Sequence, residues 1–74
     1  MTDNLTWQQI HTLLNNMTNT LEHKTAVIRT IPRINYNELL SVLTNRTQFK
    51  YDKNIELTLN IEDETITIIL KKNH

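Results

Sequence analysis

The sequence has no glycine and no cysteine among its 74 residues, and it has a single proline. Average glycine usage of about 7% would give a chain of this length roughly five. Phosphate-binding loops, dinucleotide-binding turns, nucleophile elbows and calcium-binding EF loops all need glycine, because their backbone takes positive φ or approaches a ligand closely. The missing glycine therefore excludes these four kinds of site together.

The missing cysteine removes disulfides and thiolate metal ligands, two common means of stabilising a small domain. A single domain over residues 1–74 buries only about 60% of the surface that its unfolded chain exposes. Oligomerisation is the remaining way to bury more surface. Eight acidic residues balance eight basic ones, so the net charge gives no general attraction to nucleic acid or anionic lipid.

The chain also lacks the segments that direct a protein to a membrane. It has no run of the roughly 20 apolar residues that cross a bilayer. Its first residues, MTDNLTWQQ, show no basic stretch followed by an apolar core, the pattern of a signal peptide. With 38% hydrophobic and 22% charged residues, the composition is typical of a folded globular protein. We expect a cytoplasmic protein without membrane contact.

A first helix is predicted from Trp7 onward. Thr6 and Gln9 form a capping-box pattern, in which each side chain accepts a hydrogen bond from the other residue's backbone. Apolar residues then recur at steps of three and four, as on one face of a helix. We expect this face to pack on the rest of the protein; it consists of Trp7, Ile10, Leu14, Met17 and Leu21.

A second, shorter helix is predicted over residues 36–44. Asn35 and Glu38 repeat the capping pattern, and Ile34 with Leu39 is placed to form a hydrophobic staple across the helix start. In a chain without glycine, asparagine is the residue that most readily takes the left-handed conformation at a helix end, so Asn45 is expected to end this helix. The residues expected to face inward are Tyr36, Leu39, Leu40 and Leu43.

A strand is predicted between the helices, over residues 25–31 (TAVIRTI), because β-branched residues dominate there and Pro32 follows. Its alternation of polar and apolar residues is poor. One side carries Val27, Arg29 and Ile31, and the other carries Ala26, Ile28 and Thr30. The pattern fits a strand that is either bulged or apolar on both sides.

The last third of the chain predicts a hairpin over residues 55–70 (IELTLNIEDETITIIL). If the three acids turn the chain, three apolar pairs fall on one side: Ile61 with Ile66, Leu59 with Ile68, and Leu57 with Leu70. A turn over residues 52–54 would add a strand around Phe49 and Tyr51, with Lys50 beside Glu56 and Glu56 beside Lys71. The terminal strand would then form an edge of the sheet.

These elements together predict the fold class α+β. The expected architecture is a two-layer sandwich in the order α-β-α-β-β-β, in which a mostly antiparallel sheet is covered on one face by two helices. The position of the first strand in the sheet stays open.

The hairpin register leaves Ile69 on the outer face of the sheet, where a soluble monomer usually has a polar residue. Its expected neighbours on that face are Thr58, Thr65 and Thr67. A single exposed apolar residue is common and needs no function. The alternative is a surface that binds a protein partner or a second copy of the chain, through this face or through the edge of the terminal strand.

Two charged segments give further hypotheses. Glu62, Asp63 and Glu64 form an acidic turn that a basic groove of a partner protein would fit. Residues 24–53 carry six basic residues against two acids, which indicates phosphate contacts with nucleic acid as the alternative function. The residues assigned to that alternative are Arg29, Arg33, Arg46 and Lys53.

No pattern indicates catalysis, a cofactor, a metal site or a small-molecule substrate. His11 and His23 are separated by roughly 120° around a helix, and Ser41, the only serine, has no histidine near it in sequence. We therefore expect a small, non-enzymatic protein-binding module. The bias toward Asn, Thr, Ile and Lys is typical of AT-rich coding and suggests an accessory or inhibitor protein of a low-GC bacterium, a phage or another mobile element.

Overall fold

The computed structural model describes residues 4–46 and 54–73. Its elements are α1 (Trp7–Leu21), β1 (Ala26–Pro32), the 3₁₀ helix η1 (Arg33–Asn35), α2 (Tyr36–Asn45), β2 (Ile55–Ile61) and β3 (Thr65–Lys72). The α+β class is confirmed, with the order helix, strand, helix, strand, strand. The strand expected around Phe49 and Tyr51 lies outside the described residues. None of the helices described is long and apolar enough to cross a membrane.

The sheet has the strand order β1-β3-β2, and β3 is antiparallel to both neighbours. The predicted hairpin register is confirmed in all three apolar pairs, and Glu56 lies opposite Lys71 as expected. The prediction that the terminal strand forms an edge is wrong. Because β1 pairs with the other side of β3, the last strand in sequence is the central strand of the sheet.

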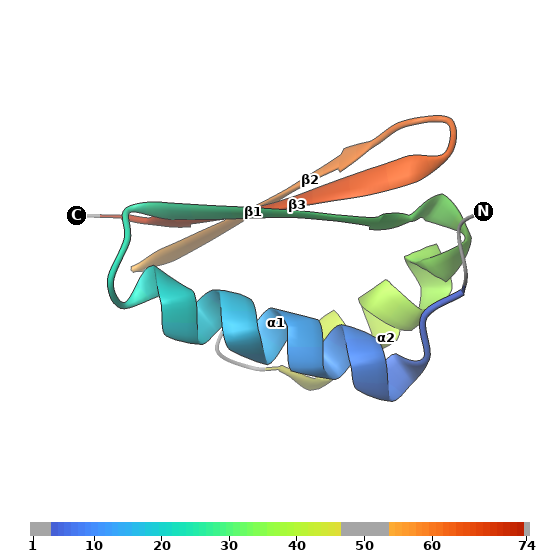
Figure 1. Cartoon of the computed structure of the whole chain (residues 1–74), viewed down its shortest axis with the longest axis horizontal. Helices are drawn as coiled ribbons and strands as arrows, with labels where there is room; N and C mark the ends of the chain where they lie inside the picture. The colour runs from blue at the N-terminus through green and yellow to red at the C-terminus, as the bar shows by residue number, and fades with distance from the viewer. Residues whose placement is uncertain (1–3, 47–53, 74) are drawn as a thin grey trace.

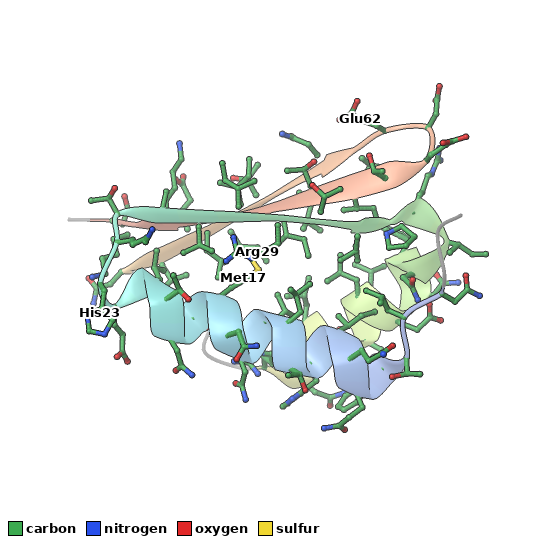
Figure 2. The ribbon with its side chains drawn as sticks, in the orientation of Figure 1. Met17, His23, Arg29 and Glu62 are labelled. Atoms are coloured by element: carbon green, nitrogen blue, oxygen red, sulfur yellow. The ribbon has the colours of Figure 1, made fainter. Side chains whose placement is uncertain are left out.

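Both helices lie on the same side of the sheet (Figure 1). The hydrophobic core fills the space between these layers, and Figure 2 shows Met17 of α1 directed into it. The core consists of Ile10, Leu14, Met17 and Leu21 from α1, Val27 and Ile31 from β1, Leu39 and Val42 from α2, and Ile66, Ile68 and Leu70 from β3.

The start of α1 is as predicted. Thr6 is the N-cap, and it forms the full capping box with Gln9. Trp7 was expected to face inward, but it is exposed at the helix edge. Its indole stacks on the His11 ring with centroids 5.3 Å apart, and its Nε1 donates to Ser41 Oγ at 3.1 Å. The indole therefore bridges α1 to α2 at the protein surface.

The orientation predicted for α2 is correct for two of its four residues. Leu39 is buried and Leu43 is partly buried against the core, as expected. Tyr36 and Leu40 are exposed instead, and Val42 is the other buried residue of this helix. The apolar residues of this segment fit two overlapping helical stripes, and packing against α1 and the sheet selects between them. Asn45 is not a left-handed exit, because no described residue has positive φ. It is the last residue of α2, and its Nδ2 donates to Ser41 O at 3.0 Å.

Asn35 does not act as the predicted cap. Its side chain makes no capping hydrogen bond, and Ile34 is 66% exposed, so the staple does not form either. The buried Asn35 amide instead pairs with the backbone of the N-terminal arm: Oδ1 accepts from Leu5 N at 2.9 Å, and Nδ2 donates to Leu5 O at 2.6 Å. Nδ2 also donates to Glu38 Oε1 at 3.1 Å. This amide fastens the arm before α1 to the start of α2.

Replacing Asn35 with alanine should lower the free energy of unfolding by about 2 kcal/mol, because it leaves the part-buried Leu5 backbone groups without their Asn35 partners. Asn37→Ala, at an exposed position of α2, is the matched control and should cost well under half as much. Urea denaturation followed by circular dichroism measures both. Equal losses in the two variants would mean that the Asn35 amide is not a structural fastening.

Candidate functional site

The structure brings the predicted outer-face residues together. Ile69 lies opposite Thr58 on β2 and opposite Ile28 on β1, which makes a row across all three strands. The next row consists of Thr30, Thr67 and Asn60. Both helices lie on the other side of the sheet (Figure 1), so neither covers these rows.

Ile28 is the residue of this face that sequence reasoning did not single out. It is 55% exposed and lies directly beside Ile69 in the register. The strand pattern had placed it opposite Val27 and Ile31, but only the β1–β3 pairing shows that it adjoins Ile69. The outer face therefore carries a pair of neighbouring isoleucines where the sequence indicated a single one.

The outer face as a whole is nearly uncharged. Its members are Ala26, Ile28, Thr30, Pro32, Glu56, Thr58, Asn60, Thr65, Thr67, Ile69 and Lys71, taken from the alternation of the described strands. Glu56 and Lys71 are the two charged residues among them, and they lie opposite each other. No member is aromatic, so this face offers no ring on which a nucleic acid base could stack.

The acidic turn is fastened to the end of β1 by Arg33. The Arg33 backbone N donates to Glu64 O at 2.9 Å, and its Nη1 lies 3.4 Å from Glu62 O. Within the turn, Glu62 N donates to Thr65 O at 2.9 Å. Glu62, Asp63 and Glu64 are all exposed, and Figure 2 shows Glu62 on the side of the hairpin that faces away from the helices. Arg33 thus fixes the shape of an exposed acidic tip.

The four basic residues assigned to nucleic acid binding do not form a strip within the described part of the chain. Arg29 lies in the middle of β1, whereas Arg33 lies beside the acidic turn. Arg46 follows the last residue of α2 and is half-buried. Desolvation by burial lowers its pKa from the usual range, although a guanidinium stays charged at neutral pH. Lys53 lies outside the described residues.

A hollow of about 300 Å³ lies beside the acidic turn and is lined by Arg33, Tyr36 and Ile61. Ile61 ends β2, and the other two lining residues flank Asn35 and Ile34 at the start of α2. No sequence signal indicated this hollow, because it depends on how η1 turns the chain beneath the hairpin.

Potential metal ligands do not cluster in the part of the chain that the structure describes. Residues 4–46 and 54–73 contain no group of three or more His, Cys, Asp or Glu side chains placed to hold a metal ion. The hydroxyl of Ser41 accepts the indole N–H of Trp7, and His23 lies in the turn after α1 (Figure 2). Comparison of the chain with protein-family models, curated proteins and solved structures finds no match.

Two features of β1 hinder its free edge from pairing with a strand of another chain. Thr25 O accepts from Lys72 N, and Arg33 N donates to Glu64 O, so odd-numbered residues of β1 bond to β3 and even-numbered ones point to the opposite edge. There, the Ile28 carbonyl accepts from Arg29 Nη1 at 2.7 Å, and Pro32 has no N–H to offer. A charged side chain and a proline are common means of keeping an edge strand from pairing with another chain.

Replacing Arg29 with threonine should therefore increase self-association, because it exposes the Ile28 carbonyl and keeps high strand propensity. Sedimentation velocity over a concentration series should show a larger weight-average mass for Arg29→Thr than for the wild-type chain. Lys24→Thr removes the same charge from the preceding turn and should leave the mass unchanged. If both variants self-associate to the same extent, loss of charge is the cause; in that case, or if neither self-associates, the Arg29 bond does not protect the edge.

Proposed function

We propose that this protein is a non-enzymatic protein-binding module that acts by occupying a partner's surface with the outer face of its sheet. The partner is another protein or a second copy of the chain. The observation that carries the proposal is the pair formed by Ile28 and Ile69 in the middle of a sheet face that neither helix covers.

The chemistry of this face suits a protein partner. Full burial of an isoleucine side chain contributes roughly 1.5–3 kcal/mol, so covering the partly exposed pair adds useful affinity without making the free protein insoluble. Threonine hydroxyls beside the pair can donate and accept hydrogen bonds at the border of an interface. A core of apolar side chains with a polar border is the usual composition of protein interfaces.

A binding module of this size fits an accessory or inhibitor role, the kind that phages and other mobile elements of low-GC bacteria encode. It would act in the cytoplasm without a cofactor or small-molecule substrate. The support for this part is the AT-biased composition and the small cysteine-free chain.

Substituting Ile69 with lysine should abolish partner binding, because it places a charge at the centre of the proposed interface. Ile28→Thr should weaken binding by about fivefold, as expected for the loss of roughly 1 kcal/mol of apolar contact. Asn15→Lys adds the same charge to the exposed side of α1 and should have no effect. Quantitative affinity purification with each variant as bait detects a foreign partner, and sedimentation velocity detects a second copy.

Unchanged binding and unchanged mass in Ile69→Lys would rule out the outer face as the interface. The alternative, nucleic acid binding, predicts a different result. Affinity for DNA or RNA would then fall steeply with added salt and drop when Arg29 and Arg33 are replaced together. If that result were found, and Ile69→Lys bound DNA or RNA as well as the wild-type chain does, nucleic acid binding would be the better explanation.

A further inference from the structure

A second exposed surface lies at the other side of the hairpin, around the hollow lined by Arg33, Tyr36 and Ile61. Tyr36 is 37% exposed and Ile61 is 47% exposed, although both are large hydrophobic residues. They come from different elements, the start of α2 and the end of β2. Among the described residues, the lining of the hollow thus combines one tyrosine, one isoleucine and one arginine.

The apolar surface continues from the hollow along α2. Leu40 follows Tyr36 by four residues, so the two side chains lie one turn apart on the same face of the helix. Leu40 is also exposed, as is Ile34 in η1. The described residues include six exposed large hydrophobics, and four of them belong to this region: Ile34, Tyr36, Leu40 and Ile61. A concentration of this kind is typical of an interaction surface.

The charges beside the hollow are mostly negative. Arg33 supplies one positive charge, and the turn that follows Ile61 supplies three negative ones, Glu62, Asp63 and Glu64. The Arg33 guanidinium already donates to the Glu62 carbonyl, and the Arg33 backbone N donates to the Glu64 carbonyl. The hollow therefore has a border of net negative charge whose position relative to the lining residues is fixed by hydrogen bonds.

We propose that this hollow and its acidic border bind a basic protein segment that carries a large apolar residue. The apolar side chain enters the hollow between the Tyr36 ring and Ile61, and flanking lysines or arginines lie near the acidic turn. A cation over the exposed Tyr36 ring adds a cation–π contact. The inference concerns a surface separate from the outer face, so it does not depend on the pair of isoleucines there.

The same charges disfavour other occupants. A nucleic acid or an acidic segment would bring its negative charges toward three carboxylates, and screening weakens that repulsion only beyond about 8–10 Å at physiological salt. A neutral apolar segment would gain nothing from the acidic border. The combination of an apolar hollow with a negative border is therefore specific to a segment that is both apolar and basic.

The test is an NMR titration of the ¹⁵N-labelled full chain with the peptide Lys-Lys-Leu-Leu-Lys-Lys at low salt. Amide shifts should change at Arg33, Tyr36 and Ile61 and in the acidic turn, and should not change in the row of Ile28 and Ile69. Glu-Glu-Leu-Leu-Glu-Glu should not bind. Lys-Lys-Ser-Ser-Lys-Lys should shift only the turn, with affinity at least about fivefold lower because it lacks the apolar contact.

Variants separate the two parts of the surface. Ile61→Thr should weaken peptide binding about fivefold. Joint replacement of the turn acids by Gln, Asn and Gln should weaken it about tenfold at low salt and remove most of its salt dependence. The matched controls are Ile28→Thr on the outer face and Glu22→Gln after α1, and both should bind as the wild-type chain does.

Tyr36→Gln repeats the apolar test from α2, so the result does not rest on Ile61→Thr remaining folded. Equal peptide affinity in these hollow variants and in the controls would overturn the proposal, as would shifts confined to the outer face. If Ile69→Lys loses partner binding through the outer face but binds the peptide normally, the proposal for the hollow stands and the two surfaces bind different partners.

Discussion

The register of β3 between its two neighbours is the constraint on which the rest of the structure depends. Every second residue of this strand, Ile66, Ile68 and Leu70, is fully buried under the helices, and the residues between them form the centre of the outer face. Because side chains alternate strictly along a strand, a slip of one residue would exchange the two sets. The same hydrogen bonds therefore define the core, the pair of the exposed Ile28 and the half-buried Ile69, and the position of the acidic turn.

The parts of the fold that the sequence predicted are those set by local signals. The capping box at Thr6 joins residues three positions apart, and the hairpin register follows from the turn between two consecutive strands; both are confirmed. The orientation of α2 and the role of Asn35 could not be predicted in the same way. The Asn35 amide pairs with Leu5, thirty residues earlier. Such a contact competes with local capping, and the sequence around Asn35 does not reveal it.

The candidate surfaces show the same division. Ile69 could be singled out because the regular hairpin leaves it on the wrong side for an apolar residue. Ile28 could not, since its own strand has an ambiguous pattern and only pairing with β3 brings the two together. Likewise, the basic residues of the middle segment looked continuous in sequence, yet the fold sends Arg33 to the acidic turn. Surfaces made from several elements have no signature in any one of them.

The strand order has a consequence for synthesis of the protein on the ribosome. The central strand is the last of the described strands to be made. Ile66, the register partner of Ile31, is therefore synthesised 35 residues after it. Until Thr65–Lys72 has emerged, β1 has no neighbour among the described strands, and the backbone groups that it pairs with β3 have no partner there. Closing such a distant pairing is slow compared with local helix formation. A nascent or truncated chain that stops before β3 should thus depend on chaperones or be degraded.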